Sequence, residues 1–250
     1  MTALDIAAIV WTLLAIAIFP TQFFVTAPYG RHAHSKWGPS IPNRLGWCIM
    51  ELVSLVLFVS LFLFGPLEKT APMWVFFALW AAHYTNRSLI FPWRTRTRGK
   101  MMPLAIVGSA IAFNLVNAGL NGLQLGWLGF VYPQSWLTDP RFIIGLAVFV
   151  LGAGINIWAD NKLLALRADG NQDYAIPRGG FFTWISCPNH FGEIVQWTGF
   201  AIMCWNLPAL SFAVWTAANL IPRAVSHHKW YRKTFPDYPQ DRRAVIPALL

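Results

Sequence analysis

Seven long apolar runs, separated by short polar segments, dominate the sequence. In order, they cover residues 6–25, 46–65, 71–93, 103–133, 142–159, 181–205 and 207–222. A run of about 20 apolar residues makes a helix long enough to cross the hydrocarbon core of a bilayer. The pattern predicts an all-α, polytopic membrane protein with seven transmembrane helices. The last two runs meet at Asn206, so a re-entrant hairpin in place of two full spans is also compatible with the sequence.

Composition agrees with a membrane protein. Of 250 residues, 56% are hydrophobic and only 12% are charged, with 14 Trp and 19 Phe, more apolar surface than a soluble domain of this size needs. The three cysteines, Cys48, Cys187 and Cys204, all lie in apolar runs without zinc or disulfide spacing, so they do not indicate a redox compartment. The first run has no basic segment before it and no clear cleavage pattern after it, so no cleavable signal is predicted.

The net charge of +9 is distributed in a way that indicates topology rather than nucleic-acid binding. Lysines and arginines gather in the segments 31–44, 94–100 and 162–178 and in the tail from residue 223, whereas the alternate loops contain Lys69 and Arg141. Short cytoplasmic loops are enriched in basic residues. The N-terminus is therefore predicted outside and the C-terminal tail in the cytoplasm, with no nucleic-acid partner. The bacterial inner membrane and the endoplasmic reticulum both fit this topology.

Two apolar runs contain isolated polar groups that are candidates for chemistry. In the second run Trp47 and Glu51 are four residues apart and share a helix face, and in the third run Tyr84 lies three residues before Arg87. Placing a charged side chain at membrane depth costs about 2.5–3.5 kcal/mol even on the gentler insertion scales, so such residues usually face an interior site. A carboxyl and a phenol can both donate a hydrogen bond to a carbonyl oxygen of a lipophilic substrate.

The fourth run has a polar stripe whose simplest interpretation is structural. The stripe consists of Asn114, Asn117, Asn121 and Gln124, and the glycines near it are Gly119, Gly122, Gly126 and Gly129. Small residues allow helices to approach closely in membranes, and amides can hydrogen-bond between helices. We therefore expect helix packing rather than ligand binding from this stripe.

A polar island, Ser186 to Glu193, interrupts the sixth run. Asn189 and Glu193 share a helix face there, and Pro188 breaks or kinks the helix. The fifth run ends with Asn156 and Asp160 at the same spacing. A buried cluster that only joins helices is one interpretation, but a ligand site is favoured because polar residues in membrane spans are costly.

Several familiar sites are missing from the sequence. No GxGxxG motif follows a strand pattern and no GxxxxGK[ST] motif occurs, which excludes a Rossmann or P-loop nucleotide site. His227 and His228 lack a third ligand at a recognised spacing, so no metal site is predicted. An activated serine or cysteine nucleophile with its base is also not evident. Polarising a carbonyl group is the chemistry best supported by the residues, and a reduction would need an external hydride donor.

Several motifs follow one another along residues 154–247: Gly154 to Asp160, Tyr174 to Thr183, Pro188 to Ile194, Trp197, His227-His-Lys-Trp-Tyr231, Phe235-Pro-Asp-Tyr-Pro239 and Arg242-Arg-Ala-Val-Ile-Pro247. In this order they closely resemble the steroid 5α-reductase family. Earlier matches are thinner: Tyr29-Gly30, Trp47 with Glu51, and His83-Tyr84 with Arg87. The segment 93–100 differs in length from the family pattern, which leaves its phosphate contacts unassigned.

The resemblance implies an enzyme that uses NADPH to saturate the C4–C5 double bond of a 3-oxo-Δ4-steroid. In the family, seven helices enclose a cavity, with the steroid entering from the lipid and the cofactor from the cytosol. Residues 1–133 would then be the substrate side, and residues 142–250 the cofactor side with the cytoplasmic tail. The matching cofactor positions are Asn156, Asp160, Arg167, Tyr174, Asn189, Glu193, His227 and Tyr231; the matching substrate positions are Trp47, Glu51 and Tyr84.

The resemblance assigns Glu51 and Tyr84 as the catalytic pair that polarises the C3 carbonyl while hydride reaches C5. Alternatives remain at this point. One is a reductase of another lipophilic enone, such as a sterol, a polyprenal or an enoyl thioester. Others are a membrane methyltransferase that uses S-adenosylmethionine, and a non-catalytic protein that binds or transports lipids. The oligomeric state is open, and a monomer is one option.

Overall fold

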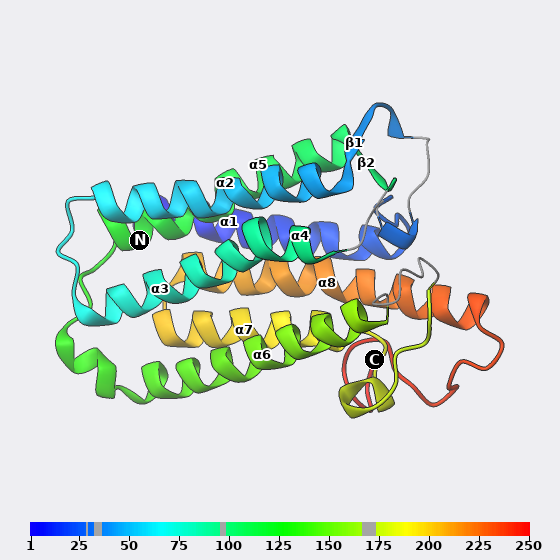
Figure 1. The fold of residues 1–250 in the computed structure, drawn as a ribbon. Coiled ribbons are helices and arrows are strands. Elements are labelled where there is room, and N and C mark those ends of the chain that lie inside the picture. Colours follow the sequence, from blue (N-terminus) through cyan, green and yellow to red (C-terminus); the bar gives the residue numbers. More distant parts are fainter. Residues whose placement is uncertain (29, 33–36, 96–98, 167–173) are drawn as a thin grey trace. The chain divides into compact units, whose positions relative to one another are not determined.

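A computed structural model describes residues 1–28, 30–32, 37–95, 99–166 and 174–250, and most of these residues are helical (Figure 1). The long helices are α1 (Ala3–Ile18), α2 (Asn43–Phe64), α3 (Ala71–Thr85), α5 (Leu104–Leu123), α6 (Pro140–Ala165), α7 (Pro188–Cys204) and α8 (Leu207–Thr234). The shorter elements are η1 (Phe19–Phe23), η2 (Gly30–His32), β1 (Ser40–Pro42), η4 (Asn86–Ile90), α4 (Phe91–Arg94), β2 (Met101–Pro103), η5 (Gln124–Leu128), η6 (Gln134–Thr138) and η7 (Gly180–Thr183). The predicted all-α class is confirmed, apart from the three-residue antiparallel pair β1–β2.

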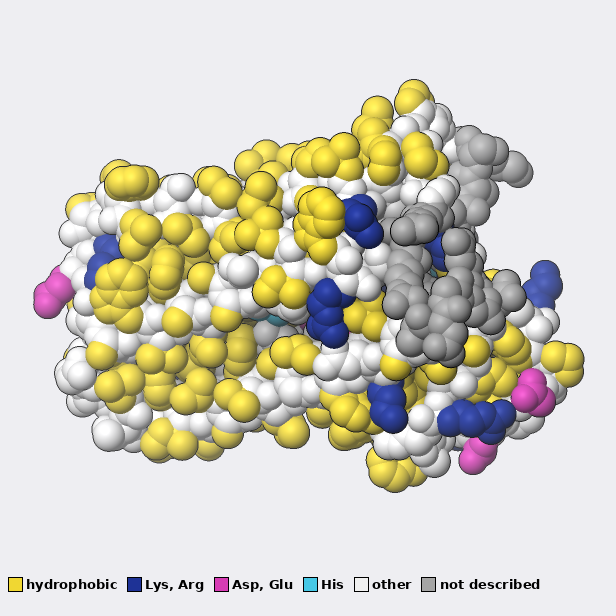
Figure 2. All heavy atoms as spheres, in the orientation of Figure 1, with side chains coloured by type: hydrophobic (Ala, Val, Ile, Leu, Met, Phe, Trp, Pro, Cys, Tyr) yellow, Lys and Arg dark blue, Asp and Glu magenta, His cyan; other side chains and the backbone are white. Residues whose placement is uncertain are grey.

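Among the described residues, four helical segments are long and apolar enough to cross a membrane: Ala3–Phe23, Asn43–Phe64, Leu104–Leu128 and Pro140–Ala165. Their outer faces are apolar as well. On α6, for example, Ile143 is 54% and Leu151 is 60% exposed. Figure 2 shows hydrophobic side chains over much of the helix surface on the face that it draws. The remaining predicted spans fall on helices of 15 residues (α3) and 17 residues (α7) and on α8, which has a basic end.

The chain divides into two compact units. Unit 1 consists of Met1–Ile9 and Ala27–Pro140, and unit 2 of Val10–Thr26 and Arg141–Leu250. The predicted substrate residues all belong to unit 1, and the described predicted cofactor residues all belong to unit 2. The roles of the two parts as substrate side and cofactor side stay a prediction.

In unit 1, α2 and α5 pack side by side (Figure 1). A Cβ on Gly122 would lie 2.8 Å from the Leu61 Cβ, and a Cβ on Gly126 only 2.1 Å from the Leu61 carbonyl oxygen, so these positions accept only glycine. The Asn114 amide nitrogen donates to the Met50 carbonyl oxygen at 2.7 Å between the same helices. The packing interpretation of the asparagine and glycine stripe is therefore confirmed at these residues.

The third predicted span changes its helix type near its end. After α3 the chain forms the π-helix η4, in which the Phe91 N–H donates to the Asn86 carbonyl oxygen five residues earlier. Pro92 follows directly; it has no N–H for the ordinary bond to Ser88, and its ring would clash with that carbonyl group. The wider turn of a π-helix relieves this clash, and such turns are frequent at functional sites.

In unit 2, α6 and α7 pack through glycines on both helices, a contact that the sequence pattern did not predict. A Cβ on Gly152 would lie 2.2 Å from the Gln196 nitrogen, and one on Gly192 would lie 2.5 Å from the Asn156 nitrogen. Gly145 and Gly199 meet the partner backbone in the same way, at 2.4 and 2.3 Å. Only glycine permits such close contact. This packing brings the Asn156 turn of α6 against the first turns of α7.

Helix α8 begins and continues for identifiable reasons. The Asn206 side-chain oxygen accepts a hydrogen bond from the Ala209 N–H at 2.9 Å, which caps the first turn. Pro222 lies inside the helix and cannot donate to the Ala218 carbonyl group. Gln22, in the same unit, donates its side-chain amide to that carbonyl oxygen at 3.1 Å. The helix therefore runs to Thr234, well beyond the apolar run that the sequence predicts to end at residue 222.

Candidate functional site

In unit 2, three predicted cofactor residues, the buried Asn156 and Asp160 and the half-buried Asn189, form one hydrogen-bonded cluster. The Asn156 side-chain amide donates to the Asn189 carbonyl oxygen at 2.9 Å, and the Asn189 amide donates to a carboxylate oxygen of Asp160 at 3.2 Å. Asn156 is 3% and Asp160 is 7% exposed. The glycine contacts between α6 and α7 set the spacing that allows both bonds. The Asn156 amide on α6 and the Asn189 amide in the first turn of α7 are thus each oriented by a hydrogen bond.

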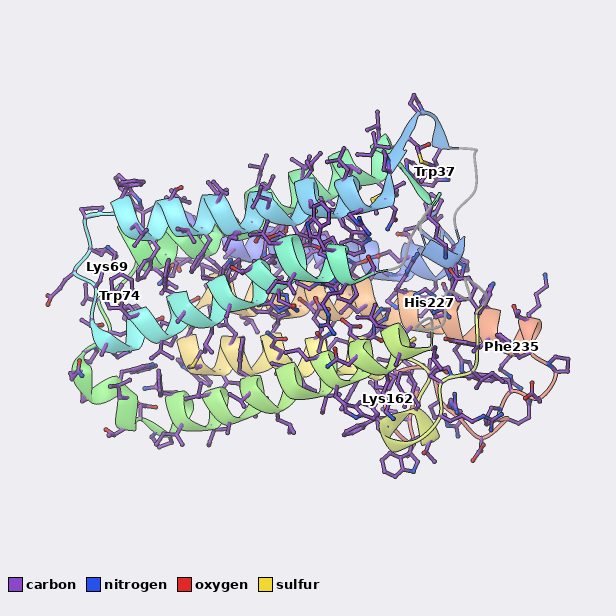
Figure 3. All side chains as sticks on the ribbon, in the orientation of Figure 1. Trp37, Lys69, Trp74, Lys162, His227 and Phe235 are labelled. Atoms are coloured by element: carbon purple, nitrogen blue, oxygen red, sulfur yellow. The ribbon has the colours of Figure 1, made fainter. Side chains whose placement is uncertain are left out.

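Helix α8 contributes aromatic and imidazole groups to the same unit. His227 and Tyr231 are four residues apart on one face of α8, and the His227 ring lies 5.5 Å from the ring of His190 on α7. Figure 3 shows His227 on α8, ahead of Phe235, which follows the helix end. The Tyr174 ring packs edge-on against Trp230 at 4.9 Å. The structure therefore brings α7, α8 and the segment at Tyr174 together.

Glu193 and Arg167 are the remaining two predicted cofactor residues. Glu193 lies on α7 one turn after Asn189 and is half-buried. Arg167 lies outside the described residues, so its predicted role stays a prediction.

Beside the predicted residues lies a polar cluster to which the sequence reasoning gave no role. The Ser186 hydroxyl oxygen is 2.7 Å from His228 Nδ1 and 2.7 Å from the Tyr238 hydroxyl oxygen. Arg242 donates to the Tyr238 oxygen at 3.4 Å and to the Pro177 carbonyl oxygen at 3.2 Å. His228, Tyr238 and Arg242 fall in the motifs that indicate the family, and Ser186 begins the polar island of the sixth run; these are the signals that could have found them.

His228 lies in an electropositive, half-buried position beyond the predicted spans. Burial lowers the pKa of its imidazole, and the nearby guanidinium groups of Arg232, Arg242 and Arg243 lower it further. Each of these effects disfavours a positive charge on the ring. His228 is therefore neutral in the folded protein near pH 7.

In unit 1, the predicted substrate residues lie among aromatic side chains. The Arg87 guanidinium lies 5.2 Å from the Trp47 ring centroid and 5.2 Å from the Phe91 ring centroid, a cation–π arrangement on both sides. Trp47 and Glu51 occupy one face of α2, and Arg87 belongs to η4, so this face of α2 is turned toward the π-helix. The π-helix thus places the Arg87 guanidinium beside Trp47, one helical turn from the predicted catalytic carboxyl of Glu51.

Tyr84 is the last buried residue of α3 and is 4% exposed. Its ring lies 5.2 Å from the Trp80 ring and 5.1 Å from the His83 ring. The Ser88 hydroxyl donates to the Tyr84 carbonyl oxygen at 2.6 Å, which fixes the backbone at the step from α3 to η4. The phenol is therefore held on a rigid element, as a catalytic donor needs to be.

The two clusters can do different chemistry. Unit 2 offers amides, carboxyls, an imidazole and phenols, the mixture of donors and acceptors that the carboxamide, ribose and phosphate groups of a dinucleotide require. Unit 1 offers a carboxyl and a phenol on helices with aromatic side chains nearby, which suits a lipophilic molecule with one oxygen to bind. In the part of the chain that the structure describes, no group of three or more His, Cys, Asp or Glu residues could hold a metal ion.

Comparison with known proteins decides the family. A family model described as 3-oxo-5-alpha-steroid 4-dehydrogenase matches residues 100–250. The chain is 42% identical to a steroid 5-alpha-reductase of Solanum lycopersicum over 249 residues, which cover 96% of this chain and 95% of that protein. The chain belongs to the 3-oxo-5-alpha-steroid 4-dehydrogenase family.

Animal members of this steroid dehydrogenase family are about as similar. The 3-oxo-5-alpha-steroid 4-dehydrogenase 1 of Bos taurus is 39% identical over 251 residues, covering 99% of this chain and 97% of that protein. The corresponding protein of Homo sapiens is 37% identical over 250 residues, covering 98% and 95%. The similarity thus includes both units, and the family resemblance inferred from the sequence motifs is confirmed.

Proposed function

We propose that this protein reduces the C4–C5 double bond of 3-oxo-Δ4-steroids, with NADPH as the hydride donor. The observation that carries the proposal is the near-full-length similarity to proteins named as steroid 5-alpha-reductases and 3-oxo-5-alpha-steroid 4-dehydrogenases. The chemistry of the two residue clusters supports it. The substrate gains one hydride and one proton, and the cofactor is oxidised to NADP⁺.

Glu51 and Tyr84 are the proposed catalytic residues. Both donate hydrogen bonds to the C3 carbonyl oxygen of the steroid and stabilise the negative charge that develops on this oxygen during hydride addition at C5, as an oxyanion hole does. Solvent supplies the proton at C4. The Trp47 ring contributes to the steroid-binding surface, and its contact with Arg87 holds it in place. Aromatic surroundings exclude water, which strengthens both hydrogen bonds.

NADPH, when bound, supplies the hydride. The residues proposed to hold it are Asn156, Asp160, Arg167, Tyr174, Asn189, Glu193, His227 and Tyr231. The observed bonds from Asn156 to Asn189 and from Asn189 to Asp160 support this role, since they orient polar groups before the cofactor binds. Arg167 would pair with the 2′-phosphate that distinguishes NADPH from NADH.

The proposal includes a location in the membrane. Seven helices would cross the bilayer, with the N-terminus outside and the tail in the cytoplasm, where NADPH is available. The four helices that meet the length and hydropathy requirement support a membrane protein. The steroid would enter from the lipid, since it partitions there. The membrane would be either a bacterial inner membrane or the endoplasmic reticulum.

The direct test is NADPH oxidation by the purified protein with a 3-oxo-Δ4-steroid present, followed by identification of the product. We expect steroid-dependent loss of NADPH absorbance and a 5α-reduced 3-ketone. A panel containing a sterol, a polyprenal and an enoyl thioester would separate this function from reduction of another lipophilic enone. Oxidation with one of these compounds but not with the steroid would overturn the substrate assignment.

A further inference from the structure

Ser186, His228, Tyr238 and Arg242 form a directed chain of hydrogen bonds, in which all residues except the half-buried His228 are buried. Arg242 can only donate, so the Tyr238 oxygen accepts from it, and the phenol proton is directed to the Ser186 oxygen. The Arg243 carbonyl oxygen already accepts the Ser186 N–H at 2.8 Å. The Ser186 hydroxyl has two acceptors within reach, the Arg243 carbonyl oxygen at 3.0 Å and, at the shorter distance of 2.7 Å, Nδ1 of the neutral His228 ring. Ser186 is 3%, Tyr238 is 2% and Arg242 is 4% exposed.

A serine beside a histidine could also be a nucleophile with its base, but the geometry argues against this role. A nucleophilic oxygen must be open to the substrate. The Ser186 oxygen is buried, and three groups surround it: the His228 ring, the Tyr238 hydroxyl and the Arg243 carbonyl oxygen at 3.0 Å. Ser186 instead acts as a junction in the chain of hydrogen bonds that connects separate segments of the protein.

These hydrogen bonds join three segments of the protein, and each segment contains a proposed cofactor residue. Arg242 holds the Pro177 carbonyl oxygen, three residues after Tyr174. Ser186 lies three residues before Asn189, at the start of α7. The Tyr238 ring stacks on the ring of Tyr231 on α8, with centroids 5.2 Å apart and planes 12° apart.

Backbone bonds fix the same junction. The Ser186 and Cys187 N–H groups donate to the Arg243 and Ala244 carbonyl oxygens at 2.8 and 3.0 Å, and the Arg243 N–H donates to the Trp184 carbonyl oxygen at 2.8 Å. The C-terminal segment thus lies along the residues that lead into α7. Its own side chains then reach the Tyr174 segment and α8.

We infer that Ser186, His228, Tyr238 and Arg242 are positioning residues for the cofactor: they hold the Tyr174 segment, the start of α7 and the Tyr231 turn of α8 in the arrangement that binds NADPH. The inference rests on the proposed function and adds residues that do not themselves contact the cofactor. Pre-organised groups bind a ligand with less loss of conformational freedom. Loss of these hydrogen bonds should therefore weaken cofactor binding and leave the chemical step intact.

The first test compares Tyr238→Phe and Ser186→Ala with the wild-type enzyme. Each variant removes buried hydrogen bonds but little volume. We expect the KM for NADPH, and its Kd measured by fluorescence without steroid, to rise about 3- to 10-fold, the scale of one or two net hydrogen bonds. The kcat and the KM for the steroid should change less than about 2-fold on that same scale. Thr198→Val is the matched control, since this exposed hydroxyl bonds only within α7, to the Ile194 carbonyl oxygen.

The second test uses His228 and distinguishes positioning from general destabilisation. His228→Leu removes the acceptor at Nδ1, whereas His228→Asn places an amide oxygen close to the same point. We expect weaker NADPH binding in the leucine variant and recovery of most of the affinity in the asparagine variant. A residue needed only for folding would lower the amount of folded protein without this selective recovery.

The outcomes are separable. Folded variants that bind NADPH as tightly as the wild type would overturn the positioning role while leaving the proposed function untouched. Equal losses of affinity for the steroid and for NADPH would also contradict the positioning role. The same would follow if His228→Leu and His228→Asn bound NADPH equally well. A wild-type protein that binds no NADPH would instead refute the proposed function, and the positioning role would fall with it.

Discussion

The two clusters of candidate residues are built differently. In unit 2, Asn156, Asp160 and Asn189 are joined by directed hydrogen bonds, and a second chain of such bonds runs through Ser186 and Tyr238. In unit 1, Trp47 and Tyr84 lie against Arg87 and Trp80 through ring contacts. Hydrogen bonds fix orientation, whereas aromatic contacts provide apolar surface with less directional constraint.

This difference matches the two molecules that the proposal requires. A dinucleotide has many polar atoms in fixed positions, so its site gains from amides that are already oriented. A steroid is a rigid hydrocarbon with few oxygens, so its site needs apolar walls and only one or two donors. Changes in unit 1 should therefore affect the chemical step, and changes in unit 2 should affect cofactor affinity or stability.

The largest effect is expected from Tyr84→Phe. The change keeps the ring contact with Trp80 and removes only the hydroxyl. If the phenol stabilises the developing enolate, kcat should fall about 10²- to 10³-fold, with NADPH affinity unchanged. If the ring only packs, stability should change by about 0.5–1.5 kcal/mol and the rate per folded molecule should stay normal. Measuring kcat and thermal stability on one detergent preparation separates the two cases.

The next largest effect is expected from Glu51→Gln. The amide has nearly the same shape as the carboxyl but is a poorer proton donor, so we expect turnover to fall about 10²-fold while NADPH still binds. Ser109→Ala is a suitable control because its exposed hydroxyl bonds only to the Ile106 carbonyl oxygen of its own helix. Near-normal turnover of Glu51→Gln would remove this carboxyl from the mechanism.

For the cofactor side, Arg167→Ala tests which group reads the 2′-phosphate. The loss of a charge-assisted pair should raise the Kd for NADPH about 10-fold and leave NADH binding almost unchanged. The ratio of the two dissociation constants is the quantity to measure. If both constants rose equally, Arg167 would not read the phosphate, and Arg94, Arg96 or Arg98 would become the better candidate.

Gly152→Ala tests the helix contact that positions the cofactor cluster. Its Cβ would lie 2.2 Å from the Gln196 backbone nitrogen, so we expect a loss of about 1–3 kcal/mol in the free energy of unfolding, as for other overpacked sites. Gly154→Ala is the matched control, two residues away on the same helix with nothing within 4 Å. The control should be neutral or slightly more stable. Equal melting temperatures for both variants would contradict the close α6–α7 contact.

The smallest effect concerns pH. Because burial and Arg232, Arg242 and Arg243 lower the pKa of His228, the unfolded chain binds a proton more readily than the folded protein. This contribution to stability is present above the ordinary histidine pKa of 6.5 and is lost as the pH falls through the lowered pKa. The melting temperature of the wild type should therefore decrease more between pH 7 and pH 5 than that of His228→Asn. Parallel curves would refute this contribution.

Sequence patterns predicted much of this structure because the length and periodicity of an apolar run largely determine where a membrane helix lies. The run 46–65 agrees closely with α2, and the run 142–159 lies within α6, which continues to Ala165. The long run 181–205 is α-helical only from Pro188, where a proline favours a start, and it begins with the short 3-10 helix η7. The bond by which Gln22 satisfies the Ala218 carbonyl oxygen beside Pro222 could not be predicted, because Gln22 is distant in the sequence.

The roles of the candidate site residues stay predictions. The family motifs pointed to Asn156, Asp160 and Asn189, and the structure joins these three residues by hydrogen bonds. The positioning chain through Tyr238 was missed, since it depends on where the C-terminal segment lies, and local spacing does not determine this. For the same reason the paired glycines of α6 and α7, unlike those near Gly122, gave no clear signal before both helices were in place.

The most direct test of the central claim is the destination of the hydride. Purified protein would be given a 3-oxo-Δ4-steroid and NADPH that contains deuterium at the transferring position, and the product would be analysed by mass spectrometry and NMR. The proposed function predicts one deuterium at C5 of a 5α-reduced 3-ketone, with the C4 proton derived from water. A product without deuterium, or with deuterium at C3 in a reduced alcohol, would contradict conjugate reduction of the C4–C5 double bond.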